Sequence, residues 1–457
     1  MGARKTTLGK EVARLLRRPF VDVDHAIAAE HGPIPELFAR QGEPAFREIE
    51  ARFVREALAR PEPTVVAVGG GAVETPGLLR DERATVAHLL VDVETAWDRV
   101  RRSSRPLAQD ETEFRRRFEL RAPLYAEAAD ATARDVDDLV LAAAGVHVER
   151  GALRRLGELV PGEGPAALVS DPHVAGIHGM DAQLALGPRL AERHELPPGE
   201  EAKTLAAVDR LWQELSLDRG GTIVALGGGC TTDAAGFAAA TYLRGVAWTP
   251  VPTSLVGQVD AAIGGKTAID LPQGKNLVGA FHWPDRTVVD PAVLGTLPEP
   301  QRLEGMAEVV KAGLLAGERL WELPDDELVR RSAAYKAAIC LRDPFEQGER
   351  AVLNLGHTFA HALEAAAGYE GLTHGRAVAL GLLAALRLSG RDTQVVEEVL
   401  HPEPARVDAG RAWEAMRRDK KVRDGELRLV VLGPRGPEHG VAVPEADVRR
   451  ELDRLIA

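Results

Sequence analysis

The chain has 457 residues, 45% of them hydrophobic and 28% charged, which excludes a globally disordered protein and suggests about three domains. Its 57 Lys and Arg against 69 Asp and Glu give a net charge of −12, which argues against a nucleic-acid partner. The two cysteines exclude a disulfide framework, and the lack of a long apolar run or a signal-peptide core predicts a cytoplasmic protein with no membrane partner.

The N-terminal third alternates helical and strand patterns. The expected elements are helices over 8–17, 35–60 and 111–128 and strands over 19–24, 64–71 and 84–93. The strand at 64–71 is apolar and runs into three glycines. Strands that alternate with helices predict a parallel, three-layer α/β sheet.

A composition break near 139–146 separates this region from the rest of the chain. Residues 164–300 again alternate strands with helices, and from about residue 304 helical periodicity dominates, up to a late strand at 426–432. We therefore expect two α/β domains followed by a mostly α-helical one. Their predicted bounds are 1–142, 146–300 and 301–457.

The N-terminus partly matches the phosphate-binding pattern G-x-x-x-x-G-K-[ST], in which backbone amides cradle phosphates, the Lys reaches their oxygens and the hydroxyl holds Mg²⁺. Lys5 and Thr6 fit its last two positions. The first glycine and the strand that feeds the loop would lie before Met1, and Arg4 stands where the second glycine should be. A solvated basic N-terminus is the alternative interpretation of this fragment.

Residues downstream favour the phosphate loop. In chain order they are Asp22, Asp24, Arg47, Gly69–Gly71, Arg105 and Arg121. With them, residues 1 to about 140 resemble shikimate kinase. The resemblance implies that ATP is held by Gly2, Ala3, Arg4, Lys5, Thr6 and Thr7 with Arg105 as a lid residue, Mg²⁺ by Thr6, and shikimate by Asp24, Arg47, Gly70 and Arg121. Because Arg4 replaces a conformationally required glycine and the first strand is missing, we predict weak or absent kinase activity.

A second glycine turn, Gly227–Gly229, follows a predicted buried strand and precedes a helix. Such a turn lets the backbone approach a pyrophosphate at a helix N-terminus, although a tight packing turn explains three glycines equally well. The next run places Asp260, Lys266, Lys275 and Asn276 within 17 residues rich in glycine. This density of lysine and glycine in apolar surroundings favours phosphate or cofactor binding over a solvated face.

Histidines mark the last third of the chain. His357 and His361 lie four residues apart on a helical pattern and so share one face, His374 follows, and Glu308 lies on another predicted helix. His and Glu are suitable zinc ligands, and three protein ligands leave a position open for substrate or water. A helix-packing pair is the alternative for His-x-x-x-His, and His361 is also a candidate substrate contact or supporting group.

From about residue 146 to 457, many runs match one family in number, order and spacing. They are PGEEAK, GGGCTTDAAGF, YLRG, PTSL, QVDAAIGGKT, GKN, VLGTLP, GMAEVVK, LNLGHTFAHALE, LTHG and RRDKKVRDGEL. With them the chain resembles 3-dehydroquinate synthase. The resemblances imply a P-loop kinase-like three-layer parallel sheet, then an α/β NAD-binding domain, then a mostly α-helical metal- and substrate-binding domain.

The resemblance assigns residues to four roles. NAD would be held by Pro198, Gly199, Glu200, Glu201, Ala202, Lys203, Gly229, Cys230, Thr231, Thr232, Asp233, Thr253, Ser254, Lys266, Lys275, Val293, Leu294, Gly295 and Thr296. Zn²⁺ or Co²⁺ would be held by Glu308, His357 and His374. The catalytic set would be Asp260, Lys266, Lys311, Lys336 and His361. Further substrate contacts would come from Arg244, Asn276, Arg350, Asn354 and one of Lys420 or Lys421.

The implied reaction converts 3-deoxy-D-arabino-heptulosonate 7-phosphate into 3-dehydroquinate and phosphate, which would make the chain a bifunctional-type enzyme of the shikimate pathway and a homodimer. The alternatives are another sugar phosphate cyclase or a metal-dependent polyol dehydrogenase, with the N-terminal domain as a non-catalytic appendage. A dehydrogenase would not need the phosphate set Lys266, Lys275 and Lys311. Arg376, where an acidic residue is usual, is the departure nearest the predicted metal ligands.

Overall fold

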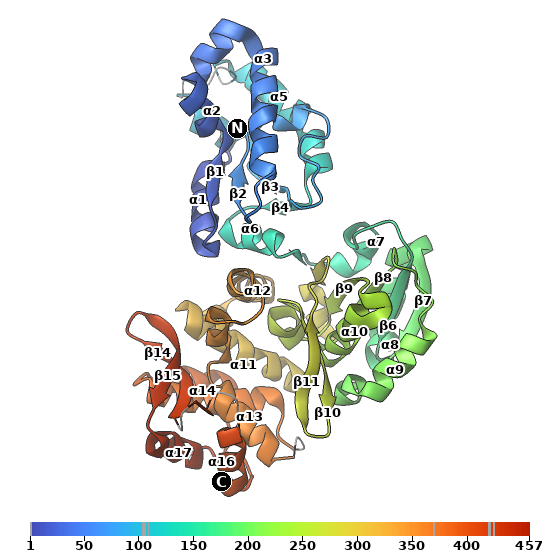
Figure 1. The fold of residues 1–457 in the computed structure, drawn as a ribbon, viewed down its shortest axis with the longest axis vertical. Coiled ribbons are helices and arrows are strands. Elements are labelled where there is room, and N and C mark those ends of the chain that lie inside the picture. The colour runs from blue at the N-terminus through green and yellow to red at the C-terminus, as the bar shows by residue number, and fades with distance from the viewer. Residues whose placement is uncertain (1, 103–106, 108, 369–370, 419–421, 424–425) are drawn as a thin grey trace. The chain divides into compact units, whose positions relative to one another are not determined.

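The computed structural model describes residues 2–102, 107, 109–368, 371–418, 422–423 and 426–457. The chain divides into two compact units, Met1–Ala144 and Gly145–Ala457, which are treated separately below (Figure 1). The predicted boundary between 300 and 301 lies inside the second unit. Among the described helices, none is long and apolar enough to cross a membrane.

The first unit is built from short strands and longer helices. Its elements are α1 (Lys5–Leu16), β1 (Phe20–Asp22), α2 (Val23–His31), α3 (Ile34–Leu58), β2 (Val65–Ala67), the 3-10 helix η1 (Ala72–Glu74), β3 (Ala87–Leu89), α4 (Val93–Val100), α5 (Glu111–Ala128), β4 (Ala131–Ala133) and α6 (Val136–Ala143). Aspartates accept backbone N–H groups at the starts of α2, α4, α5 and α6, which explains where these helices begin. Gly42, with φ of 79°, kinks α3.

The four described strands of this unit form two separate parallel pairs. β1 pairs with β2, and β3 pairs with β4. Both β2 and β3 line one cavity of 1810 Å³, which also reaches the aliphatic face of α1. The α/β class is therefore confirmed, but the parallel strands are not joined into the single predicted sheet.

The second unit begins with a three-layer α/β region. Its elements are β5 (Val146–Val148), η3 (Ala152–Arg155), α7 (Leu156–Leu159), β6 (Ala166–Ser170), α8 (Pro172–Leu186), η4 (Gly187–Arg189), β7 (Leu190–Glu195), η5 (Gly199–Lys203), α9 (Leu205–Glu214), β8 (Thr222–Gly227), α10 (Gly229–Thr241), η6 (Tyr242–Arg244), β9 (Ala247–Pro252), the π-helix η7 (Gly257–Ala261), β10 (Lys266–Leu271), β11 (Gly274–Phe281), β12 (Thr287–Val289) and η8 (Pro291–Thr296).

Four of these strands form a parallel sheet in the order β7-β6-β8-β9, and β5 pairs with β12, also in parallel. β6 and β8 are buried along their whole length, as expected for apolar runs covered on both faces. The strands β10 and β11 form a separate antiparallel hairpin that packs against α10 (Figure 1). Because the sheet is parallel, the carboxyl ends of its strands meet at one edge, where ligands bind in such folds.

The rest of the second unit is mostly helical. Its elements are α11 (Glu299–Ala316), η9 (Leu320–Glu322), α12 (Asp325–Arg342), η10 (Glu349–Asn354), α13 (His357–Ala366), α14 (His374–Leu388), α15 (Gln394–Leu400), α16 (Ala409–Arg418), β13 (Val422–Arg423), β14 (Glu426–Gly433), β15 (Gly436–Val443) and α17 (Glu445–Asp453). One apolar core joins α11, α13, α14, α16 and α17.

The sequence predicted one strand in this region, whereas β13, β14 and β15 form an antiparallel sheet beside α14 (Figure 1). β15, with the sequence GPEHGVAV, was missed because polar residues and glycine interrupt its apolar pattern. The β10–β11 hairpin was missed for a similar reason, since its lysines and glycines indicated a binding loop rather than strands.

Candidate active site

In the first unit, the predicted phosphate loop leads directly into α1. Arg4 is the N-cap of this helix and has a left-handed backbone with φ of 61°, a conformation that favours glycine. Lys5 Nζ lies 2.7 Å from Asp24 Oδ2, and the Thr6 hydroxyl donates to Asp22 at 2.5 Å. The loop's cation and its hydroxyl are thus both bound to carboxylates of the same unit.

The two arginines predicted to hold a carboxylate substrate are also paired internally. Arg121 is buried and donates from Nε and Nη2 to the two oxygens of Glu74, at 3.1 and 3.0 Å. Arg47 contacts Glu74 at 3.1 Å, and also Glu43 at 2.9 Å and Glu50 at 2.6 Å. Sequence reasoning missed these glutamates. Tyr125 donates to the Gly70 carbonyl at 2.6 Å, and Arg105 lies outside the described residues.

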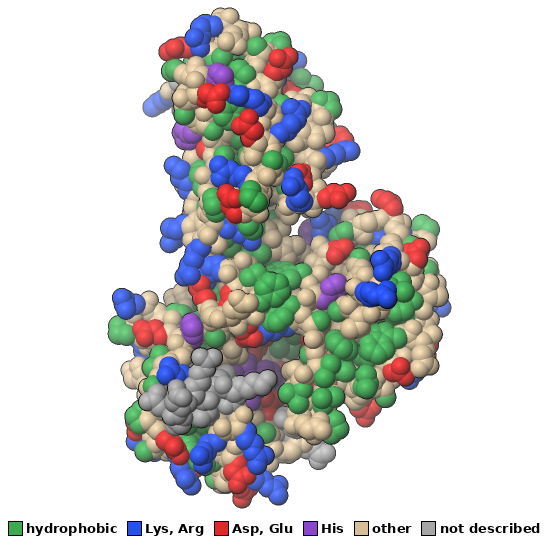
Figure 2. Space-filling model, viewed as in Figure 1, with side chains coloured by type: hydrophobic (Ala, Val, Ile, Leu, Met, Phe, Trp, Pro, Cys, Tyr) green, Lys and Arg blue, Asp and Glu red, His purple; other side chains and the backbone are tan. Residues whose placement is uncertain are grey.

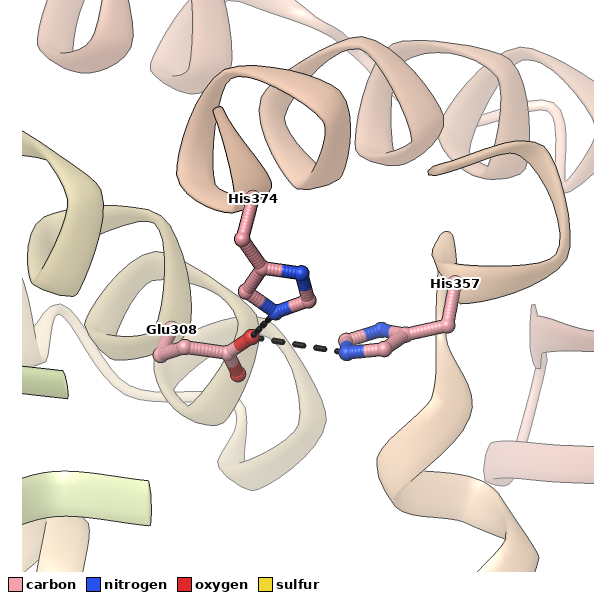
Figure 3. Close-up of side chains that lie close together, drawn as sticks. All are labelled: Glu308, His357 and His374. Atoms are coloured by element: carbon pink, nitrogen blue, oxygen red, sulfur yellow. Dashed lines mark ion pairs between the residues drawn. The ribbon is translucent and has the colours of Figure 1, made fainter. Parts of the chain in front are cut away.

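In the second unit, three side chains from three helices converge, as Figure 3 shows. Glu308 lies in the middle of α11, whereas His357 and His374 are the first residues of α13 and α14. Each imidazole Nε2 lies 3.4 Å from Glu308 Oε1, and one candidate ligand atom from each of the three residues lies within 4.8 Å of the others. This is the donor set and spacing that a divalent cation requires.

The bonding state of Glu308 supports this interpretation. Both carboxylate oxygens are buried, and among the described residues neither accepts a well-directed hydrogen bond. Burial alone would raise the pKa of Glu308, but the paired Lys311 ammonium and the imidazole of His357 outweigh it and hold the pKa well below its usual range. The carboxylate is therefore anionic with open acceptor capacity, which fits a metal ion.

The other ring nitrogen of each histidine faces an oxygen. His357 Nδ1 lies 3.2 Å from the Leu355 carbonyl, and His374 Nδ1 lies 3.5 Å from Oε1 of the buried Glu364. In a neutral imidazole whose Nδ1–H is directed at these oxygens, the Nε2 lone pair would face the side of Glu308 and could bind a metal ion. His361 follows one turn after His357 on α13, with ring centroids 5.6 Å apart.

A lysine–carboxylate chain extends from this cluster. Lys336 on α12 lies 2.5 Å from Asp260 Oδ1 and donates to the Asp260 carbonyl at 2.6 Å. Burial raises the pKa of Asp260, but the positive charges of Lys336 and Lys311 outweigh it and lower that pKa. Since Lys311 is itself paired with Glu308, acidic and basic groups alternate between η7 and the group formed by Glu308, His357 and His374.

A third group gathers around Glu346. Lys266 Nζ lies 2.5 Å from Glu346 Oε2, and Asn354 Nδ2 donates to Oε1 at 3.3 Å. Burial lowers the pKa of Lys266 despite this partner. Arg350 is fully buried and donates to the carbonyls of Gly264 and Pro344, at 2.9 and 3.0 Å.

The predicted dinucleotide residues lie at the carboxyl edge of the sheet. The segment Gly229–Asp233 forms the first turn of α10, immediately after β8, and Thr253 and Ser254 follow β9. Lys203 lies 2.7 Å from Asp233 Oδ2 and also donates to Asn276, and Lys275 lies 2.6 Å from Glu200. Thr296 on η8 contacts His178 at 2.8 Å, a residue that sequence reasoning missed. Burial raises the pKa of Cys230 to about 12, which excludes a thiolate nucleophile there.

Comparisons with known proteins agree with this geometry. The model of the 3-dehydroquinate synthase N-terminal domain matches residues 193–304, and that of the C-terminal domain matches residues 305–422. The chain is 39% identical over 341 residues to the 3-dehydroquinate synthase of Bordetella pertussis, covering 68% of this chain and 95% of that relative. The chain belongs to the 3-dehydroquinate synthase family.

The 3-dehydroquinate synthase of Gloeobacter violaceus is 42% identical over 345 residues, which cover 68% of this chain and 96% of that enzyme. Among solved structures, a 2-deoxy-scyllo-inosose synthase complexed with carbaglucose-6-phosphate, NAD⁺ and Co²⁺ has a TM-score of 0.61 at 26% identity, over 68% of this chain and 96% of that one. A shikimate kinase model matches residues 1–144. This 3-dehydroquinate synthase therefore carries a shikimate kinase domain and is a shikimate pathway enzyme.

Most predicted residues of the synthase fall into the groups described above. Figure 2 shows that the surface of the second unit is hollowed where histidine and acidic side chains are visible. Arg244 is different. It is exposed on η6 with φ of 68°, and none of the ion pairs found among the described residues joins it to those groups. Lys420 and Lys421 lie outside the described residues. Glu346 was missed because it lies in no pattern that indicates chemistry. Glu364 ends the matched run LNLGHTFAHALE, but no role was assigned to it.

Proposed function

We propose that the second unit converts 3-deoxy-D-arabino-heptulosonate 7-phosphate into 3-dehydroquinate and phosphate, with NAD and Zn²⁺ or Co²⁺ as cofactors. The observation that carries the proposal is the convergence of Glu308, His357 and His374, which would hold the metal, beside the charged chain through Lys311 to Asp260. The names of the curated relatives and the NAD⁺ and Co²⁺ of the cyclase structure support it. A homodimer, which the resemblance implies, stays a prediction.

When bound, NAD⁺ accepts and returns hydride, and the divalent ion stabilises negative charge on the substrate oxygen. The residues of the protein would hold the nucleotide and the substrate in place for these steps. The glycine turn before α10 and the Lys203–Asp233 pair would hold the nucleotide at the sheet edge. The backbone N–H groups in the first turn of α10 are suited to binding the pyrophosphate of the nucleotide.

The remaining groups would act on the sugar phosphate. Lys266 and Arg350 form a cationic region suited to the phosphate dianion before and after it leaves. Asp260 and Lys336, joined at 2.5 Å, are placed to hold and pass a proton during oxidation of the ring hydroxyl and elimination of phosphate. His361, one turn from His357, would contact the substrate hydroxyls.

A coupled assay tests this proposal. Purified protein is mixed with the heptulosonate phosphate and NAD⁺, and inorganic phosphate, 3-dehydroquinate and NADH are followed. We expect equimolar phosphate and 3-dehydroquinate with no net NADH, and loss of activity with a chelator that Zn²⁺ or Co²⁺ reverses. Net NADH without phosphate release would favour a polyol dehydrogenase. Turnover of a different sugar phosphate in place of this one would favour another cyclase.

For the first unit we propose weak or absent shikimate kinase activity. The left-handed Arg4, the interrupted sheet and the internal pairs of Arg47 and Arg121 support this. ATP- and Mg²⁺-dependent phosphorylation of shikimate tests it, and turnover at a rate typical of kinases, about 1–100 s⁻¹, would contradict it. Calorimetric titration with shikimate and ATP separates a non-catalytic binding module, which binds without turnover, from a kinase.

A further inference from the structure

Glu304 lies one turn before Glu308 on α11 and reaches across to α14. Its Oε2 accepts the backbone N–H of Gly375 at 2.6 Å, and its Oε1 accepts the hydroxyl of Thr373. Gly375 directly follows His374 in the first turn of α14. A single carboxylate thus connects the helix that carries one metal-binding residue to the helix that carries another.

This contact replaces an ordinary helix cap. Thr373 is the N-cap of α14, but its own side chain caps no backbone N–H of the helix and donates to Glu304 instead. The first N–H groups of a helix need acceptors, and the positive end of the helix dipole favours a carboxylate. Glu304 supplies a hydrogen-bond acceptor and a negative charge to the start of α14 from the neighbouring helix α11. The start of α14 is therefore fixed to α11 rather than capped by a residue of its own.

Two glycine contacts hold the same arrangement. A Cβ at Gly375 would lie 2.4 Å from Glu304 Cα and 2.6 Å from its carbonyl oxygen. A Cβ at Gly381, further along α14, would lie 2.1 Å from the carbonyl oxygen of Gly356, which precedes His357. Backbones can approach this closely only where no side chain intervenes. The three helices that carry Glu308, His357 and His374 are therefore packed at backbone contact.

We propose that Glu304 is a positioning residue that sets the separation between Glu308 and His374 and thereby the affinity of the site for a divalent cation. The inference rests on the proposed metal site. Glu304 itself bonds to Gly375 and Thr373 and not to the ion, so it acts through the placement of His374. Partners that hold metal ligands in place typically change metal affinity by about 10- to 100-fold when removed.

The test measures metal binding without turnover. Full-length protein is stripped of metal and titrated with Co²⁺, whose visible absorption reports coordination geometry, and affinities are obtained by competition with a chelator. We expect Glu304→Ala to weaken binding by about tenfold or more and to alter the Co²⁺ spectrum. Glu304→Gln should lose less, because its amide oxygen still accepts the N–H of Gly375, and Thr373→Val should lose least.

The matched control is Glu403→Ala, which removes an exposed carboxylate that pairs with Arg376 on the same turn of α14. Its affinity should stay within about twofold of the unsubstituted protein. Melting temperatures identify any variant that fails to fold, and Glu304→Gln and Thr373→Val then decide the question.

Two outcomes would overturn the proposal: Glu304 variants that bind Co²⁺ as tightly as the unsubstituted protein, or a Glu403→Ala variant that loses as much as Glu304→Ala. His357→Ala distinguishes a different failure. If that variant binds Co²⁺ normally, the ion does not bind at the predicted ligands, and the proposed metal site is wrong together with the positioning role.

Discussion

Glu74 in the first unit and Glu308 in the second differ in whether their carboxylate oxygens accept hydrogen bonds from the protein. Both oxygens of Glu74 accept hydrogen bonds from Arg121, so the carboxylate and the guanidinium satisfy each other. The oxygens of Glu308 are buried among two imidazoles and an ammonium without a well-directed hydrogen bond. The first arrangement leaves little for a ligand to gain, whereas the second is completed by a cation.

The comparison teaches that residue types alone do not define a binding site. Arg47 and Arg121 match the residues expected to hold shikimate, yet a carboxylate of the same chain already occupies them. An external carboxylate must compete with one tethered at high effective concentration. Glu308 also has an internal partner of opposite charge, the Lys311 ammonium, but among the described residues neither of its oxygens accepts a well-directed hydrogen bond.

The largest expected effect comes from removing the open carboxylate. Glu308→Gln should reduce formation of 3-dehydroquinate by about three orders of magnitude, because the site loses its anionic ligand and Lys311 loses its buried partner. Steady-state phosphate release measures this. The control is Glu318→Gln. Glu318 is an exposed residue just after the end of α11 that pairs with Arg331, and its replacement should leave the rate unchanged. A Glu308→Gln enzyme that kept a tenth of the activity would contradict the comparison.

A smaller loss is expected one step away from the metal cluster. Asp260→Asn should lower kcat by about 100-fold, since it removes the partner with which Lys336 would hold a proton. KM should change less than kcat, because the proposed phosphate contacts at Lys266 and Arg350 remain. Steady-state kinetics give both constants, with Asp326→Asn, in an exposed pair with Arg150, as the control. A change confined to KM would assign Asp260 to binding alone.

In the first unit, removing a carboxylate should strengthen ligand binding instead of weakening it. Glu74→Gln removes the charge that pairs with Arg121 and one of the three carboxylates that pair with Arg47, so we expect shikimate to bind about tenfold more tightly. Calorimetry at constant ionic strength measures the affinity. Glu62→Gln, which makes the same charge change at an exposed pair with Arg60, should have no effect. Unchanged affinity in Glu74→Gln would show that the arginines are accessible already.

The smallest expected effect concerns backbone strain at the phosphate loop. Arg4 and Arg17 flank α1, both with left-handed backbones, at φ of 61° and 51°. Replacing either with glycine should change the stability of the first unit by less than about 1 kcal/mol, because relief of strain is offset by the freedom that glycine gains in the unfolded chain. Only Arg4→Gly should also improve ATP binding. Equal ATP affinity in the two variants would show that Arg4 is not the cause of weak ATP binding.

The sequence predicted the fold best where patterns were long. The buried strand before Gly227–Gly229, which is β8, and the helix at 111–128 appear where they were expected. Short or polar strands such as β10 and β15 could not be predicted, because their pairing depends on a partner strand rather than on local pattern. The resemblances predicted the α/β class and the helical C-terminal region, and the bounds of the three predicted domains stay a prediction.

The candidate site shows the same limit. Spacing placed His357 and His361 on one helix face, yet the second imidazole beside Glu308 comes from His374 on another helix, which only the resemblance indicated. Glu74, Glu304 and Glu346 could not be found from sequence, because each acquires its role through a contact that the tertiary fold creates. Carboxylates are too common on protein surfaces for position alone to single these out.

The β10–β11 hairpin fixes the distance between two groups of predicted binding residues. Lys266 lies at the open end of the hairpin, opposite Phe281, whereas Lys275 and Asn276 lie next to the turn. The six residues of β10, rising about 3.3 Å each, separate these ends by roughly 17 Å. The hairpin thus separates Lys266, which pairs with Glu346, from Lys275, which pairs with Glu200. Lengthening both strands by two residues would keep every side chain on its face while moving the far end outward by about 7 Å.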